Sequence, residues 1–289
     1  MFSLALLIFL VKSFEWSCES HMIIWQIAIN DMGDQYFSSA VMPLLMRLES
    51  PDKMSHYNNI YEHACWADDI KRLTRFEHTF NWHFYDIPYF EVSNEKIDVK
   101  LPKENVAWAI NIAKSTLLGS TKGYSKSEML RYLIHFMGDV HQPLHVASKY
   151  SLKFPDGDLG GTLFLIKLAE QNLHSLWDTC LGFIQRKMYI RPLEEASIED
   201  IKERALNIQK EHPRSSYGMI NITDGYEIAE SVHNLTVELA YKGISEGSEP
   251  SAEYLYGGRE LCVKMIALSG YRLADAIRGS IVVGVKSDL

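Results

Sequence analysis

The chain has 289 residues, enough to bury a sizeable core as one large domain or two smaller ones. Apolar residues make up 47% and charged residues 23% of it, which argues against a disordered chain. The formal net charge of −8 argues against a protein that grips a long duplex with an excess of basic residues. Phosphate binding would therefore depend on local charge, such as a bound metal ion.

An unbroken apolar run, Leu4 to Val11, lies close to the start of the chain. It is too short to span a membrane and has the length of a signal-peptide core, although a buried N-terminal helix is the alternative. We predict a signal peptide with cleavage in the region of Ser13, Phe14 and Glu15, and hence a secreted or lumenal protein. No later stretch reaches about 18 apolar residues, so we expect no membrane anchor.

Cysteine number and spacing bear on the same question. An even number of cysteines in an exported chain suggests two disulfides, for which three pairings are possible. No Cys-x-x-Cys occurs, which argues against a thiolate zinc site. Asn221 and Asn234 begin glycosylation sequons, which matter only in a secreted chain. The cysteines that would remain after cleavage are Cys18, Cys65, Cys180 and Cys262.

Most of the chain carries apolar residues at helical spacing. Pro102 stands where a first helical turn would begin, and Ser125 with Glu128 forms a capping-box pattern. Only Thr162 to Leu168 alternates like a short strand. We therefore expect an all-α fold, a mostly helical single-domain bundle with one short strand or hairpin. In chain order, the predicted helices cover residues 22–29, continuing over 35–48, then 57–73, 102–119, 125–140, 173–186, 198–211, 225–242 and 252–278.

Two pairs of histidine and aspartate stand four residues apart in predicted helices. His135 and Asp139 form the first pair and His174 and Asp178 the second, so each pair lies on one helix face. His145 follows just past the end of the first helix. Helical bundles build metal sites from such side chains on facing helices. Nitrogen and oxygen ligands without thiolate suit zinc in a catalytic, partly open site.

The alternative for such a pair is an ion pair on a solvated helix face, which is common. The neighbours argue otherwise, because they are apolar. Leu133 and Phe136 flank His135, and Trp177 follows His174 closely. Two pairs with a further histidine between them therefore favour the metal site.

Four motifs follow one another along the chain: Trp66-Ala-Asp-Asp-Ile-Lys71, Leu133-Ile-His-Phe-Met-Gly-Asp-Val-His-Gln-Pro-Leu-His145, Gly160-Gly161 and Asn172-Leu-His-Ser-Leu-Trp-Asp178. Together they resemble the zinc-dependent class I nucleases. This family includes fungal single-strand nucleases, plant bifunctional nucleases and protozoan 3′-nucleotidase/nucleases, and is related to bacterial zinc phospholipases C. The resemblance runs from about Trp16 to about Ile277.

The resemblance implies a bundle built around three zinc ions, with Asp139 bridging two of them. Trp16 would bind through its free α-amino group and carbonyl, so cleavage would follow Glu15. Residues 1–15 would then be the signal peptide and residues 16–289 the nuclease domain. The implied ligands are Asp68, His83, His135 and Asp139 for the first zinc, His145, His174 and Asp178 for the second, and Trp16, His21 and Asp139 for the third.

The implied reaction is hydrolysis of phosphodiester bonds in single-stranded DNA and RNA and of 3′-phosphomonoesters, leaving 5′-phosphate ends. Asp68 would also orient the attacking water, and Lys71 would stabilise the transition state. Phe84 would stack one base and Asp86 would accept from its edge, which requires an unpaired base. No obligate protein partner is expected.

Three features depart from the family pattern. Thr162 stands where the family usually has an Asn that helps to hold the phosphate. The loop from His145 to Gly160 is longer than usual. Trp25 stands where plant relatives often have a disulfide cysteine. The disulfide pairs suggested by the resemblance are Cys18 with Cys65 and Cys180 with Cys262.

Other candidates have ordinary explanations. His141 lies within a motif but off the face of His135, so we expect a structural hydrogen-bonding role. The segment from Glu194 to Glu203 is expected to be a solvated helix face. Two rival functions remain: a phospholipase C of the same superfamily, and a binding protein with a structural or inactive metal site. The remaining histidines, expected at the surface or in the core, are His56, His63, His78, His212 and His233.

Overall fold

The structure is a computed structural model that describes residues 16–47, 59–71, 73–91, 99–121, 123–169, 171–184, 189–218 and 220–281. The predicted signal peptide, His56 and the start of the helix predicted from Tyr57 lie outside these ranges. Within them, no helix is long and apolar enough to cross a bilayer. The helices are α2 (Cys18–Met32), α3 (Asp34–Tyr36), α4 (Met42–Leu45), α5 (Trp66–Ile70), α6 (Val106–Leu118), α7 (Gly123–Asp139), α8 (Leu173–Asp178), α9 (Glu195–Glu211), α10 (Gly225–Leu239) and α11 (Ala252–Ser280).

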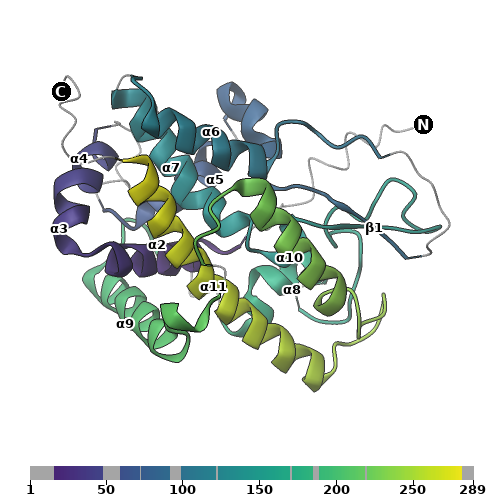
Figure 1. Cartoon of the computed structure of the whole chain (residues 1–289). Coiled ribbons are helices and arrows are strands. Elements are labelled where there is room, and N and C mark those ends of the chain that lie inside the picture. The colour runs from purple at the N-terminus through teal and green to yellow at the C-terminus, as the bar shows by residue number, and fades with distance from the viewer. Residues whose placement is uncertain are drawn as a thin grey trace.

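The core lies between the long helix α11 and the helices behind it (Figure 1). Helix α11 packs along α2 and also contacts α6 and α7, while α9 covers another side of α2. Because α2 is enclosed in this way, most of its residues are buried, including the polar Glu19, Ser20, His21 and Gln26. Gly270 allows the close crossing, since a Cβ there would lie 2.4 Å from the Ile27 side chain. The predicted all-α fold is confirmed.

Several helix boundaries differ from the prediction for local reasons. Helix α6 begins at Val106 rather than Pro102, because the Asn105 side chain caps it by accepting from the Trp108 amide at 3.1 Å. Helix α8 ends at Asp178 instead of running on towards Arg186. The next residues leave the helical conformation, with Cys180 at a φ of 50°.

Short 3-10 and π segments connect these helices. A π-helical turn, η1 (Phe37–Val41), joins α3 to α4. Next to α5 are η3 (Glu62–Cys65) and the longer η4 (Thr74–His83), and η5 (Pro143–His145) follows α7. Sequence periodicity did not predict η4, because a 3-10 helix has three residues per turn and poorer amphipathic spacing. Two more 3-10 turns are η6 (Cys180–Gly182) and η7 (Arg214–Ser216).

Two short parallel strands, β1 (Pro88–Phe90) and β2 (Ser148–Tyr150), form a ribbon in which Pro88 pairs with Ser148. The strand predicted at Thr162–Leu168 is wrong. Among the described residues this segment forms only an isolated bridge between Leu165 and Asn172. Its alternation reflects burial of Phe164 and Ile166 rather than pairing in a sheet.

One of the two suggested disulfides is present. Cys18 and Cys65 are bonded and tie the start of α2 to the end of η3. The second pairing is wrong as a bond, because Cys180 and Cys262 are buried free thiols. They nevertheless interact by a hydrogen bond, so packing of η6 against α11 brings together the side chains that the resemblance paired.

Candidate metal centre

Histidine and aspartate side chains from six elements converge in the interior beside α7. They form three groups whose ligand atoms lie within 4.8 Å of one another. Nearly all are buried; Asp68 is the most open, with 22% of its side chain exposed. The groups are His21, His135 and Asp139; Asp68, His83 and His135; and His145, His174 and Asp178.

Asp139 occupies the middle of this arrangement, at the last residue of α7. Its Oδ2 lies 3.0 Å from His83 Nδ1 and 3.1 Å from His135 Nε2. Its Oδ1 lies 3.4 Å from His21 Nε2 and 3.3 Å from His145 Nδ1. One fully buried carboxylate therefore presents its two oxygens to two separate sets of imidazoles.

Backbone carbonyls orient two of the histidines. His135 Nδ1 donates to the Ala64 carbonyl at 2.7 Å, and His174 Nδ1 donates to the Gly160 carbonyl at 2.7 Å. In each case the carbonyl holds the Nδ1 proton, so Nε2 is the nitrogen that faces a carboxylate and that would be available to a metal once it has lost its proton. His135 Nε2 faces Asp68 at 3.0 Å, and His174 Nε2 faces Asp178 at 3.6 Å.

His145 and Trp16 are the remaining predicted ligands. His145 belongs to the third group, and its Nε2 lies 3.7 Å from Asp178 Oδ1. Trp16 is fully buried, and the amide of Ser17 donates to the Asp178 carbonyl at 3.4 Å. This contact places the predicted mature N-terminus beside helix α8, which carries His174 and Asp178.

The charges in this cluster are strongly coupled. Burial opposes the charged form of His135, but the carboxylates of Asp68 and Asp139 outweigh it and raise its pKa to about 10. Burial likewise opposes charge on His145, whose pKa Asp139 and Asp178 raise to about 9. By contrast, burial and the neighbouring His135 lower the pKa of His21 to about 4. The carboxylates therefore keep His135 and His145 protonated unless another cation balances the negative charge.

These residues fit a divalent metal. The Oδ1 of Asp139 and the Oδ2 of Asp178 are buried and accept no hydrogen bond, which leaves them open to a cation. Both ring nitrogens of His21 are also buried and form no hydrogen bond. Imidazole and carboxylate ligands without thiolate match the preference of zinc in catalytic sites.

Of the predicted substrate residues, one contacts the metal groups directly and the other three are half-buried. Lys71 is buried, with its Nζ 3.3 Å from Asp68 Oδ1. Phe84 is half-buried and forms an edge contact with the exposed Phe80. Asp86 is half-buried, and burial together with nearby Asp158 raises its pKa to about 7. Thr162 is also half-buried, one residue after Gly160-Gly161.

A sequence profile of the family described as S1/P1 nuclease matches residues 16–281. The chain belongs to the S1/P1 nuclease family. It is similar to Endonuclease 2 of Arabidopsis thaliana, with 27% identity over 276 residues, which cover 91% of this chain and 89% of the plant protein. It is also similar to Endonuclease 1 of the same plant, with 26% identity over 90% of this chain and 85% of that protein. Nuclease S1 of Aspergillus oryzae shares 22% identity over 84% of this chain and 85% of its own length.

This member of the S1/P1 nuclease family has two further residues at the centre that sequence reasoning did not single out. Gly138 lies where α2 and α7 meet, and a Cβ there would lie 2.5 Å from His21 Nδ1. Gln142 donates from Nε2 to Asp178 Oδ1 at 2.8 Å. Both lie inside the motif from Leu133 to His145. Their place in this long motif was the sequence feature that could have identified them.

His141 lies away from the ligand groups, as its place in the motif predicted. Its Nδ1 donates to the Met137 carbonyl at 2.7 Å, and Arg272 donates to its Nε2 at 3.0 Å. Burial and the nearby Arg272 lower its pKa to about 3, so it stays neutral. This role is structural, joining α7 to α11.

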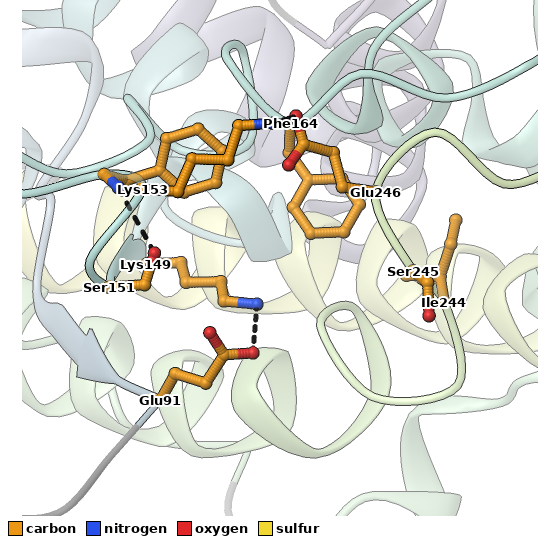
Figure 2. Close-up of a pocket in the computed structure, with 9 residues that line it drawn as sticks. Glu91, Lys149, Ser151, Lys153, Phe164, Ile244, Ser245 and Glu246 are labelled. Carbon is orange, nitrogen blue, oxygen red and sulfur yellow. Dashed lines mark hydrogen bonds and ion pairs between the residues drawn. The ribbon is translucent and has the colours of Figure 1, made fainter.

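A separate pocket of about 230 Å³ lies beside the β1–β2 ribbon, with Lys149 of β2 in its wall (Figure 2). Its charged side chains are paired across it: Lys149 with Glu91 at 2.8 Å and Lys153 with Glu246 at 2.6 Å. Its walls contain none of the predicted site residues. The pocket is therefore distinct from the predicted site.

Proposed function

We propose that this chain is a secreted, zinc-dependent endonuclease and 3′-nucleotidase. Its substrates would be single-stranded DNA and RNA and 3′-nucleotides, and its products would carry 5′-phosphate ends. Family membership supports nuclease chemistry, and the His/Asp groups support a metal. The Cys18–Cys65 disulfide and the exposed sequon residues Asn221 and Asn234 support an exported protein.

The position of Asp139 is the observation on which this proposal depends most. A buried carboxylate that offers each oxygen to a different set of imidazoles suits adjacent metal ions. We infer that three zinc ions would be held by nine residues. They are Asp68, His83, His135 and Asp139; His145, His174 and Asp178; and Trp16 and His21 with Asp139.

Bound zinc would supply positive charge to the phosphate oxygens and make water more acidic. The partly exposed Asp68 would orient the attacking water, since its carboxylate is the one that reaches solvent. Lys71 lies beside it and would bring a positive charge to the phosphate as negative charge develops there. Thr162 would contribute a hydroxyl to hold the phosphate.

Base recognition would come from the segment directly after His83. The Phe84 ring would stack on one base and the Asp86 carboxylate would accept from the base edge. Only an unpaired base can reach such a platform, which explains a preference for single strands. A phospholipase needs no base platform, so the pair favours the nuclease over that rival.

The test is an assay of the secreted, metal-loaded protein on 3′-AMP, single-stranded DNA and phosphatidylcholine. We expect hydrolysis of the first two, loss of activity after chelation and recovery with zinc. Turnover of phosphatidylcholine alone would support the phospholipase instead. Zinc binding without turnover of any of the three would support a binding protein.

A further inference from the structure

Asp158 is a fully buried carboxylate that belongs to none of the metal groups. Its Oδ1 accepts from the Lys149 amide at 2.9 Å, the Ser148 hydroxyl at 3.3 Å and the Tyr241 hydroxyl at 2.9 Å. The Gly161 amide also stabilises its charged form. Asp158 therefore joins strand β2, the segment just after α10 and the Gly160-Gly161 turn.

The backbone of Asp158 is held as firmly as its side chain. Its amide donates to the Lys149 carbonyl at 3.0 Å, and its carbonyl accepts from the Leu163 amide at 3.0 Å. The first bond ties Asp158 to β2, and the second closes the turn from Asp158 to Leu163. The side chain of Lys149 points the other way, into the pocket of Figure 2.

The turn after Asp158 is strained. Leu159, Gly160 and Gly161 have φ values of 54°, 59° and 81°. A left-handed leucine costs roughly 1 kcal/mol and persists only where its surroundings enforce it. Glycine is required next, because a Cβ on Gly160 would lie 2.4 Å from the Leu144 carbonyl. The hydrogen bonds of Asp158 are the restraint at the start of this turn.

The turn leads directly to a predicted metal ligand. The Gly160 carbonyl accepts from His174 Nδ1 at 2.7 Å, and the Gly161 carbonyl accepts from the His174 amide at 3.3 Å. The first bond decides which imidazole nitrogen keeps its proton, and therefore which one is available to a metal. A displaced turn would weaken both contacts with His174.

We propose that Asp158 is a positioning residue for His174, acting through the Gly160-Gly161 turn. It fixes the carbonyl that orients the imidazole, and so raises the zinc affinity of the group formed by His145, His174 and Asp178. This inference rests on the proposed zinc-dependent function. Asp158 itself touches neither metal nor substrate.

The test compares Asp158→Asn with Asp156→Asn, the same chemical change at an exposed position of the same loop. An amide keeps the size of the side chain but loses the charge that attracts four donors. We expect Asp158→Asn to bind the zinc of the His145, His174 and Asp178 group about 10- to 100-fold less tightly, the usual effect of losing such a supporting contact. Zinc per chain is measured after dialysis against graded chelator, and Asp156→Asn should match the unaltered protein.

Melting temperatures with and without zinc separate positioning from a general loss of stability. Positioning predicts that zinc raises the melting temperature of Asp158→Asn less than that of the unaltered protein. Equal zinc affinity, with both melting temperatures lowered alike, would overturn the inference. Tyr241→Phe removes one donor without removing the charge and should show a smaller change in the same direction; no change in zinc affinity there would also count against the inference.

A double variant tests whether Asp158 acts through His174. In a His174→Ala background, Asp158→Asn should have little further effect on zinc affinity, because the residue through which it acts is gone. Additive losses of affinity would mean that Asp158 acts elsewhere. If the unaltered protein binds no zinc at all, the proposed function fails, which is a different result from a wild-type affinity in Asp158→Asn.

Discussion

At the scale of single residues, Asp139 differs from the other carboxylates because both of its oxygens face imidazoles from separate groups. Asp139→Ala should therefore remove two zinc ions per chain, whereas Asp178→Ala should remove mainly one. Zinc per chain, measured by atomic emission on dialysed protein, tests this difference. Loss of a single ion in both variants would contradict the bridging role.

Thr162 is one of the three features at which the sequence resemblance implies a departure from the family pattern. A hydroxyl is shorter than an amide and offers one donor instead of two, so we expect it to hold the phosphate less well. Thr162→Asn should raise kcat/KM on 3′-AMP several-fold without changing zinc content. Unchanged or lower kcat/KM would mean that the long loop before Gly160 provides a substitute contact.

At the scale of elements, the crossing of α2 over α7 depends on Gly138. A methyl group there would lie 2.5 Å from His21 Nδ1, so α2 or the imidazole must move. Gly138→Ala should weaken zinc binding about 10- to 100-fold while the rest of the fold remains. Zinc titration followed by circular dichroism measures both effects. The matched control is Gly279→Ala, where a Cβ meets nothing within 4 Å.

The start of α2 carries a second prediction. The α-amino group of Trp16 can bind a metal only after the peptide bond before it is cut, and its ordinary pKa near 8 lets zinc displace the proton readily. One extra Met before Trp16 should therefore empty the third zinc position and abolish most activity, with the fold largely intact. N-terminal sequencing of the secreted protein should begin at Trp16. A fully active protein that begins elsewhere would contradict the prediction.

At the scale of the whole molecule, histidines of the metal-free centre carry protons that zinc must displace when it binds. His135 and His145 have pKa values raised to about 10 and about 9, so both are protonated at pH 7 without metal. Zinc loading at pH 7 should release about two protons from them, and affinity should rise with pH up to about pH 10. Calorimetry in two buffers of different ionisation heat measures this release. Heats that do not depend on the buffer would contradict it.

The same shifts fix the direction of the pH effect on stability. A folded pKa above the unfolded value stabilises the protein fully below the unfolded pKa of about 6.5, and this contribution is lost as the pH rises through the folded value. The melting temperature of metal-free protein should therefore fall between about pH 7 and 10. Zinc-loaded protein should show a smaller fall over that range, because the metal replaces those protons.

Local sequence patterns were enough to predict most of the helices and the His/Asp pairs of the candidate site. Helical spacing predicted most of the helices, since apolar periodicity follows directly from burial of one face. The i and i+4 pairs, such as His135 with Asp139, could be recognised because the helix alone places them together. The motifs were long enough to indicate the family.

Tertiary structure decided what depends on contacts between distant segments. The pairing of β1 with β2 joins residues about 60 positions apart and leaves no local period, so a strand was predicted at residues 162–168 instead. The need for glycine at position 138 comes from a histidine on another helix. The buried Asp158 has its donors on β2, at Gly161 and beyond α10, and its place beside the turn exists only once those three segments have packed together.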